Sequence, residues 1–332
     1  MAVQAISFNK NGYDPFIDFL KAYSILCVVI AHILPTALFK YILFQVWGEM
    51  QVPMFILIQV FHAYKKDQRP KVKWVSLLKR IIVPFIAIQV VIVGFKALVT
   101  GGFSLSLLFQ GLMLGGYGPG AYYIWVYLQI AIILVLLWGW IIKVSLKQVL
   151  LVFLFISVGF EVLFSIVDCP EPIYRLLCTR YLFLIPLGLI WLRKGVFLNR
   201  NNILLSILSI VAVLFFVFTD YDLEPFFFNT NWRFHRWICY FYVPLLLTYG
   251  LSLIWRRIKE TALIEKQVKW IATRSYEIYL AQMMVIACIK TIVPSLVSNG
   301  VVVFGILACV IFVSSFIFGG IIYWFRKVIL KW

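Results

Sequence analysis

The stretch that decides the fold is DFLKAYSILCVVIAH (Asp18–His32), an apolar run that nevertheless contains three ionisable residues. Its apolar character predicts the start of a membrane-spanning helix. Eleven residues make almost three full helical turns, so Lys21 and His32 lie nearly on one line, about 16 Å apart, with Asp18 close to that line. Ionisable groups are costly at the centre of a bilayer and usually face the protein interior or a wet cavity. The stretch therefore predicts a site that begins at one membrane face, near Lys21, and ends within the bilayer, at His32.

The composition of the whole chain is that of a polytopic membrane protein. Its 332 residues are 64% hydrophobic and 13% charged, with a mean hydropathy of +0.99, which excludes a soluble globular domain. This length holds about ten spans with short loops, so we expect one transmembrane domain over residues 1–332 and no appended soluble domain. The net charge of +17 is attributed to basic loops on one side of the membrane and not to nucleic-acid binding.

The apolar segments and the charges between them predict an all-α fold of ten transmembrane helices with both termini in the cytoplasm. Basic residues gather in alternate loops and at the end of the chain, whereas the intervening loops hold most of the acidic residues. The positive-inside rule places the basic loops in the cytoplasm. The expected spans are residues 16–38, 42–64, 76–99, 121–142, 148–167, 176–192, 203–219, 237–255, 270–291 and 300–325.

The six cysteines show neither CxxC pairs nor the Cys/His spacing of a metal site, so no metal is expected. Most of them lie in apolar runs, which is typical of packing residues. Cys169 and Cys178 flank one predicted outer loop, and they either pair there or remain free thiols.

His32 is the one histidine of three that lies well inside a predicted span. It is either a buried histidine bonded to a neighbouring carbonyl or a functional group, and its place in the bilayer favours the second. An imidazole takes and returns a proton near neutral pH, as a general base acting on a hydroxyl must. Asp18 is about 21 Å from His32 along the helix axis, so we expect Asp18 to pair with Lys21 instead.

Two more segments carry polar groups near helix ends. SLLKRIIVPF (Ser76–Phe85) brings Lys79 and Arg80 to the cytoplasmic side, where they either flank the membrane as topology requires or bind phosphates together with Lys21. Pro84 is expected to free a backbone carbonyl and bend this helix. TRSYEIYLAQ (Thr273–Gln282) opens the ninth span. In that segment we expect Ser275 to cap the helix, Glu277 to lie in its first turn, and a polar edge formed by Tyr276, Tyr279 and Gln282.

Two outer loops also stand out. GGYGPGAYYIW (Gly115–Trp125) has too much glycine and proline to be helical in its first half, and it is read either as an interfacial turn with an aromatic belt or as part of a site. The loop over residues 220–237 mixes acids and aromatic rings with Arg233, His235 and Arg236. Its composition suits sugar binding as well as a plain interfacial stretch.

Taken together, these segments resemble acyltransferase family 3, the membrane-bound O-acyltransferases that modify sugars. The family has a D-x-L-R segment with a histidine eleven residues after the basic residue. This chain matches that motif with lysine in place of arginine, at Asp18, Leu20, Lys21 and His32.

Four further motifs carry the resemblance, and the last of them, beginning at Ser275, is as specific as the D-x-L-R motif, whereas the other three are less specific. The V-P-x-F segment is present, but Gln59 and Val60 replace its usual Ser-Gly, and a late histidine is replaced by Gln282. The positions that match are Val52, Pro53 and Phe55; Arg80, Ile81 and Pro84; Tyr123 and Trp125; and Ser275, Tyr276, Ile278, Tyr279 and Leu280.

The resemblance implies an acyl-CoA, most simply acetyl-CoA, as a co-substrate from the cytoplasm, with no tightly bound cofactor. It also implies a sugar or polysaccharide hydroxyl as acceptor and a bacterial plasma membrane as the location. Cations would hold the phosphates of coenzyme A, and His32 would accept the proton of the acceptor. The remaining assignments are Lys21, Lys79 and Arg80 for the donor; Asp18, Tyr123 and Trp125 as supporting residues; Tyr276, Tyr279 and Gln282 as oxyanion donors; and Arg233, His235 and Arg236 for the acceptor.

A second function remains open at this point. The resemblance extends to proteins assigned to polysaccharide export, and the replacements at Lys21, Gln59, Val60 and Gln282 favour such a protein without acyl-transfer activity. An ion or solute transporter is weakly supported, because the sequence shows no internal repeat of the transporter kind.

Overall fold

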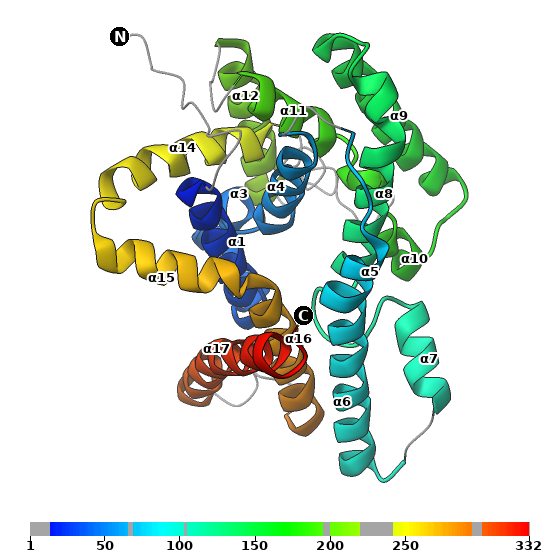
Figure 1. Cartoon of the computed structure of the whole chain (residues 1–332), viewed down its shortest axis with the longest axis vertical. Helices are drawn as coiled ribbons and strands as arrows, with labels where there is room; N and C mark the ends of the chain where they lie inside the picture. Colours follow the sequence, from blue (N-terminus) through cyan, green and yellow to red (C-terminus); the bar gives the residue numbers. More distant parts are fainter. Residues whose placement is uncertain are drawn as a thin grey trace.

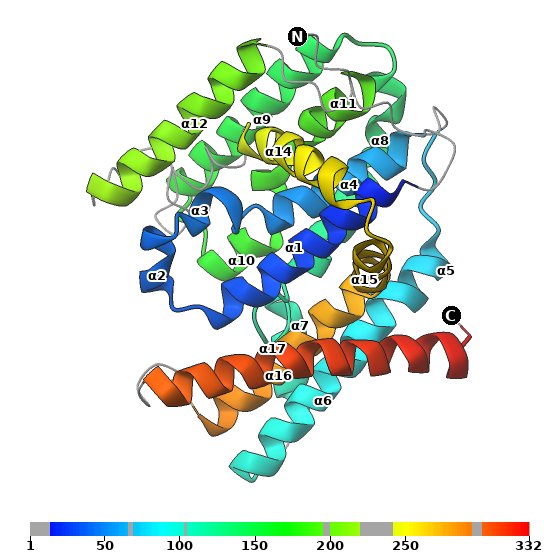
Figure 2. The same ribbon diagram turned by 90° about the vertical axis from the view of Figure 1, so that its left-hand side faces the viewer.

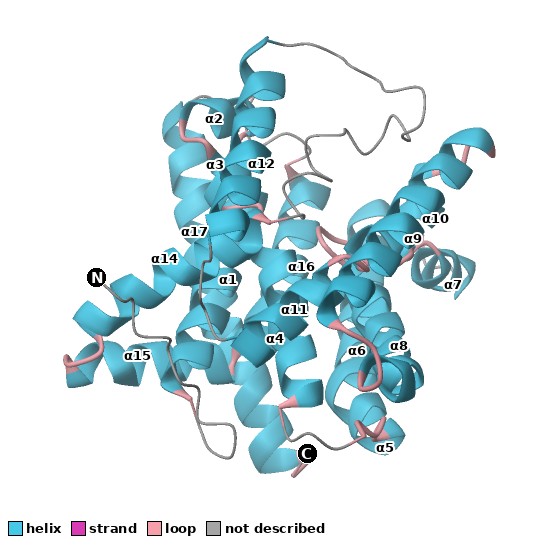
Figure 3. Ribbon diagram, turned by 90° about the horizontal axis from the view of Figure 1, so that it is seen from above, coloured by secondary structure: helices cyan, strands magenta, loops and turns pink. Residues whose placement is uncertain are grey.

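The computed structural model describes residues 14–65, 69–102, 105–194, 200–219, 242–293 and 301–331. Every regular element in these ranges is a helix, as Figure 3 shows. The prediction of an all-α fold is therefore confirmed. The elements are α1 (Pro15–Ile33), α2 (Thr36–Tyr41), α3 (Phe44–Trp47), α4 (Gln51–Tyr64), α5 (Trp74–Leu77), η1 (Leu78–Ile82), α6 (Val83–Thr100), α7 (Leu105–Met113), α8 (Tyr123–Ile141), α9 (Leu146–Ile166), α10 (Glu171–Leu176), η2 (Thr179–Tyr181), α11 (Leu184–Lys194), α12 (Arg200–Thr219), α14 (Val243–Ile258), α15 (Ala262–Thr273), α16 (Ser275–Ile292), α17 (Val301–Trp324) and η3 (Phe325–Ile329).

Two of the expected spans are broken into shorter helices. The segment expected over residues 42–64 contains α3 and α4, and Leu43 before α3 adopts the left-handed conformation, with φ 52°. The segment expected over residues 176–192 is interrupted at Leu177, whose backbone is extended. Three further helices, α7, α10 and α15, lie wholly or mostly outside the expected spans.

Five helices in the described ranges are long and apolar enough to cross a membrane. The chain is thus a multi-pass membrane protein, whereas ten spans and cytoplasmic termini stay predictions. Several other expected spans correspond to helices too short to cross alone, such as α4 with 14 residues and α11 with 11. Residues 184–191 of α11 are all buried in protein, which explains an apolar sequence in a short helix. The five candidates are residues 15–33, 74–100, 123–141, 146–164 and 303–328.

Helix α1 joins the two hydrophobic cores of the molecule and runs through its middle in Figures 1 and 2. Its first turns, including Leu20, pack into a core shared with α4, α8, α9, α11 and α14. Its later turns, including Ile25 and Val29, pack into a second core shared with α6, α16 and α17. A polar face on α1 is therefore placed where the two cores meet.

Candidate active site

Lys21 and His32 of α1 line the same cavity, which has a volume of about 640 Å³. Its walls come from α1, α4, η1, α8 and α16, together with the chain before α5 and the loop before α8. The two residues lie eleven positions apart on one helix, so the cavity follows α1 for roughly 16 Å. The sequence spacing predicted that Lys21 and His32 lie along one line on the helix, and in the structure this line borders a single cavity.

One end of this cavity is strongly basic. Five cationic side chains line it against a single carboxylate, that of Glu277. Glu277 is almost completely buried in the first turn of α16 and forms an ion pair with Arg326 of η3. An excess of cations around a cavity mouth attracts anions such as phosphates. The five cations are Lys21, Lys71, Lys73, Arg80 and Arg326.

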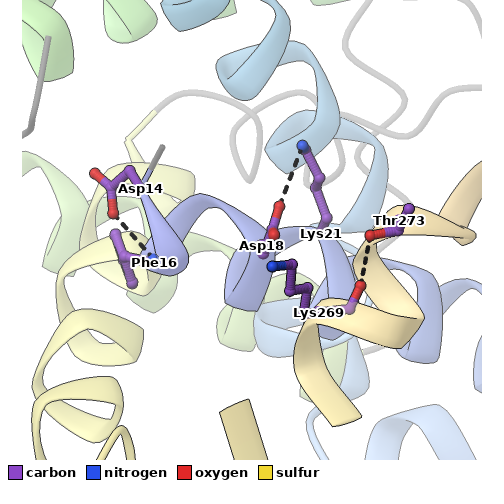
Figure 4. A network of polar contacts seen from close by, with 6 residues as sticks. All are labelled: Asp14, Phe16, Asp18, Lys21, Lys269 and Thr273. Carbon is purple, nitrogen blue, oxygen red and sulfur yellow. Dashed lines mark hydrogen bonds and ion pairs between the residues drawn. The ribbon is translucent and has the colours of Figure 1, made fainter. Parts of the chain in front are cut away.

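The predicted pairing of Asp18 with Lys21 is confirmed. The Lys21 Nζ lies 3.5 Å from Asp18 Oδ1, and the two side chains are 28% and 12% exposed. Figure 4 shows this contact and shows Lys269 of α15 pointing toward Asp18. The contact orients the Lys21 ammonium at the edge of the cavity.

The same view shows how α1 begins (Figure 4). Asp14 precedes the helix and accepts a hydrogen bond from the backbone N–H of Phe16 at 3.0 Å, which caps the first turn. Burial raises the pKa of the Asp14 carboxyl above its ordinary value, and the hydrogen bond from Phe16 opposes that rise. The cap fixes the start of the helix that carries both Lys21 and His32.

Arg80 reaches the cavity from a π-helical segment, η1 (Leu78–Ile82), which ends two residues before Pro84. π-helical turns are rare and are often found at functional sites. Lys79 and Arg80 are both exposed, but only Arg80 lines the cavity. The hydroxyl of Tyr276 donates to the Ile81 carbonyl at 2.6 Å and so ties η1 to α16. The predicted cation group is thus brought together in part, without Lys79.

The other end of the cavity is formed by His32, aromatic rings and the glycine-rich loop over residues 115–120. The structure places this loop against the site: a Cβ atom added to Gly120 would lie 3.3 Å from Nε2 of His32. Tyr279 donates its hydroxyl to the Gly120 carbonyl at 2.8 Å. Tyr123 lines the cavity beside it, with its ring centroid 6.2 Å from that of Tyr279.

The remaining predicted residues hold this loop or lie elsewhere. Gln282 lies outside the cavity lining, and its amide donates to the Pro119 carbonyl at 3.4 Å. Trp125 also lies behind the lining and donates to the Gly115 carbonyl at 3.3 Å. The prediction that Ser275 caps α16 is wrong, because the residue before α16 is Arg274 and no side chain caps it. Arg233, His235 and Arg236 lie outside the described residues.

Gln89 of α6 is a site residue that sequence reasoning missed. It is completely buried, accepts from the Tyr117 N–H at 2.6 Å and donates to the Tyr117 carbonyl at 3.1 Å. This pair of bonds fastens the glycine loop to α6. A glutamine in the middle of an apolar span was the available signal. Lys71, Lys73 and Arg326 were also missed, because charges beside a span were attributed to topology alone.

A second group of ionisable residues is closed to the cavity. Glu161 of α9 is almost completely buried and accepts a hydrogen bond from the Tyr174 hydroxyl. Arg180 of η2 is also buried, attracts Glu161 electrostatically, and lies over the rings of Tyr122, Tyr174 and Tyr181 at 4.9, 5.9 and 4.6 Å. We call Glu161, Tyr174 and Arg180 the closed cluster.

None of the cysteines that the structure describes lines the cavity. Cys169 and Cys178 are free thiols in the structure, so the alternative of a disulfide between them is not realised. Within the described ranges, no group of three or more His, Cys, Asp or Glu side chains is arranged to hold a metal ion.

The sequence matches a family model described as an acyltransferase domain, that of acyltransferase family 3, over residues 14–324. No curated protein and no solved structure matches the chain. The matched range contains every cavity-lining residue except Arg326. The resemblance that the motifs indicated is therefore confirmed.

Proposed function

We infer the function from one premise, which is that the chain belongs to acyltransferase family 3. We propose that it transfers an acyl group, most simply acetyl, from acyl-CoA to a hydroxyl of a cell-surface polysaccharide or its precursor. The single observation that carries this proposal is the cavity that joins Lys21, Arg80 and His32. It supports a phosphate-bearing donor at the basic end and a proton acceptor at the other end.

The donor is assigned to the basic end because of its charge. Lys21 and Arg80, with the neighbouring Lys71, Lys73 and Arg326, supply ammonium and guanidinium groups for the phosphates of coenzyme A. The pantetheine arm then extends along α1, and the thioester lies near His32. A bound donor held in this way meets the acceptor in a fixed orientation.

The chemistry needs one base. His32 accepts the proton of the acceptor hydroxyl while the hydroxyl oxygen attacks the thioester carbonyl carbon. The new C–O bond forms, the C–S bond breaks, and the departing thiolate of coenzyme A takes the proton back from the imidazolium. The products are the acylated sugar and free coenzyme A, and His32 is again neutral.

The oxyanion of the tetrahedral intermediate requires hydrogen-bond donors. Of the three donors proposed from the sequence, Tyr276 and Tyr279 give their only hydroxyl protons to backbone carbonyls, and Gln282 lies outside the cavity lining. Tyr123 lines the cavity next to Gly120 and Tyr279. We therefore assign the oxyanion donor to the Tyr123 hydroxyl and a supporting role to the other three.

The departures from the family motifs do not remove a catalytic group in this account. The amide of Gln59 donates to the Tyr127 carbonyl at 2.9 Å and so joins α4 to α8. Val60 packs against Gly188. A Cβ atom built on Gly188 would lie only 2.7 Å from Val60 Cβ, so the absence of a side chain at Gly188 makes room for Val60. Lys21 keeps the positive charge of the usual arginine. These observations favour the enzyme over the export protein.

The acceptor and the location rest on the family alone. We propose a sugar hydroxyl that approaches from the outer side of a bacterial plasma membrane, with Arg233, His235 and Arg236 as candidate contacts. The cytoplasmic side is assigned to the basic end of the cavity, in agreement with the positive-inside rule.

The function is tested with labelled acetyl-CoA and with the surface polysaccharide of three strains: the natural strain, a deletion strain, and a strain with His32→Ala. We expect His32→Ala protein to insert and bind coenzyme A but to transfer acetyl about 10²–10⁴ times more slowly, the contribution of a general base. The polysaccharide of both mutant strains should be present without acetyl groups. Loss of the polymer itself on deletion would instead support the export function, and full activity of His32→Ala would exclude the assigned base.

A further inference from the structure

We propose that the missing side chain of Gly120 keeps the space beside His32 Nε2 open for the acceptor hydroxyl. This inference rests on the proposed function. Gly120 has φ +82°, and a Cβ atom built on it would lie 3.3 Å from Nε2 of His32 and 3.5 Å from Cε2 of Tyr279.

The geometry of proton transfer explains why this space must be empty. A hydroxyl oxygen that gives its proton to Nε2 has to come within about 2.6–3.2 Å of that nitrogen. Carbon atoms in van der Waals contact prefer separations of about 3.5–4.0 Å. A methyl group at 3.3 Å from Nε2 would therefore compete with the acceptor oxygen for the same side of the ring. With glycine, the acceptor can approach over the backbone.

The loop that carries Gly120 is fastened at several points, so the space is a permanent feature of the fold. The Gly120 carbonyl accepts two hydrogen bonds, from the Tyr279 hydroxyl at 2.8 Å and from the Tyr123 N–H at 2.9 Å. Gln89 clamps Tyr117 earlier in the loop through its N–H and its carbonyl. These anchors prevent the loop from moving away to make room for a larger residue.

The chain offers a matched control for the backbone cost of the substitution. Gly101, at the end of α6, has a similar φ of +77°, and a Cβ atom built on it would have no atom within 4 Å. Replacing either glycine with alanine imposes the same left-handed strain, of about 1–2 kcal/mol. Only Gly120→Ala adds an atom next to His32, so the difference between the two variants isolates that contact.

The experiment measures carbethoxylation of individual histidines by diethyl pyrocarbonate, which reacts with unprotonated imidazole, followed by mass spectrometry of the full-length protein in nanodiscs. We expect Gly120→Ala to slow the labelling of His32 several-fold and to leave His62 at its normal rate. Gly101→Ala should leave both rates unchanged. Labelling of His32 at the natural rate in Gly120→Ala would overturn the proposal, and equal slowing in both variants would assign the effect to backbone strain and overturn it as well.

This readout does not require acyl transfer, so it separates the inference from the proposed function. A protein with slowed labelling in Gly120→Ala but no transfer from acetyl-CoA in the natural chain would refute the function alone. Where transfer is measured, Gly120→Ala should lower kcat and leave the KM for acetyl-CoA unchanged, because the donor binds at the other end.

If Gly120→Ala does not yield folded protein, Tyr279→Phe is the second variant. It removes the hydroxyl that holds the Gly120 carbonyl and leaves the ring in place. We expect kcat to fall while the KM for acetyl-CoA stays the same. An unchanged kcat would contradict the idea that the position of Gly120 matters for the acceptor.

Discussion

Ionisable side chains within the apolar helices of this protein are arranged in two opposite ways. In the closed cluster, Glu161, Tyr174 and Arg180 are buried: Tyr174 donates a hydrogen bond to Glu161, and Arg180 attracts Glu161 electrostatically and lies over three tyrosine rings. In the cavity, Lys21, Arg80 and His32 line a common space, and only part of their charge is balanced by carboxylates. The closed cluster can contribute only to folding, whereas the open groups can bind and react with a ligand.

The difference shows that the presence of charge in a membrane span does not by itself identify a functional site. Breaking a buried pair leaves an uncompensated charge, which is strongly destabilising. Glu277, by contrast, is paired with Arg326, a cation that lines the cavity. Equivalent substitutions should therefore mainly reduce stability in the closed cluster and mainly reduce ligand binding in the cavity, and both quantities can be measured.

The largest effect is expected from neutralising the buried carboxylates. Glu161→Gln leaves Arg180 buried without its counter-charge and should lower the free energy of unfolding by about 3–5 kcal/mol. The matched variant is Glu277→Gln, whose partner Arg326 lines the cavity and can be hydrated there. We expect a clearly smaller loss, measured by denaturant unfolding of both proteins in the same detergent. Equal losses would show that the two carboxylates occupy equivalent environments.

The second largest expected effect is a difference in acetyl-CoA binding between variants of two adjacent cations of η1, Arg80 and Lys79. Arg80→Ala should raise the Kd for acetyl-CoA, because a charge-assisted hydrogen bond contributes about 1.5–3 kcal/mol, which is a factor of roughly 10 to 150. Lys79→Ala should change that Kd little, since Lys79 lies outside the cavity lining. Equilibrium binding of labelled acetyl-CoA measures both. A larger effect from Lys79 would place the donor on the opposite face of the helix.

A matched pair of tyrosines compares the two regions with a single substitution. Tyr174→Phe removes the donor to a buried carboxylate and should cost about 1.5–3 kcal/mol of stability, whereas Tyr276→Phe removes a bond to a neutral carbonyl and should cost about 0.5–1.5 kcal/mol. Tyr276→Phe alone should also alter donor affinity, since it releases η1 from α16. Thermal unfolding and acetyl-CoA binding of the two variants test this, and an effect of Tyr174→Phe on binding would argue against the separation.

The smallest effect is that of salt. Screening shortens the reach of exposed charges from about 10 Å at 0.1 M to about 3 Å at 1 M ionic strength. Added potassium chloride should therefore weaken acetyl-CoA binding at the open cations, while the stability that the closed cluster provides stays constant. Binding that is insensitive to salt would mean that the donor is recognised through its uncharged parts.

Much of the fold could be predicted because it depends on local sequence. The spacing of Lys21 and His32 places them on one face of any α-helix, and apolar runs specify helices wherever they occur. The interruption at Leu43 was not predictable, because a left-handed conformation at a leucine is imposed by its surroundings. The number of spans was not settled either, because an apolar helix such as α11 is compatible with burial in protein as well as in lipid.

The site was predictable only where its residues share one helix. Lys79 and Arg80 were treated alike, although adjacent residues of a helix point about 100° apart, and only Arg80 lines the cavity. Gly120 and His32 belong to segments that are distant in the sequence. The hydrogen bond between Gln89 and Tyr117 helps to hold the loop of Gly120 next to His32, and no periodicity in the sequence indicates this arrangement. Tyr279 and Gln282 were singled out as a polar edge of the ninth span, but their partners are loop carbonyls that only the tertiary structure brings near.

The central claim is that a donor bound at the cations fills the cavity as far as His32. It is tested most directly by the rate at which diethyl pyrocarbonate modifies His32 with and without saturating acetyl-CoA. The account predicts that acetyl-CoA slows this modification, and that Arg80→Ala requires a higher acetyl-CoA concentration for the same protection. A rate of His32 modification that does not change at any acetyl-CoA concentration would contradict it.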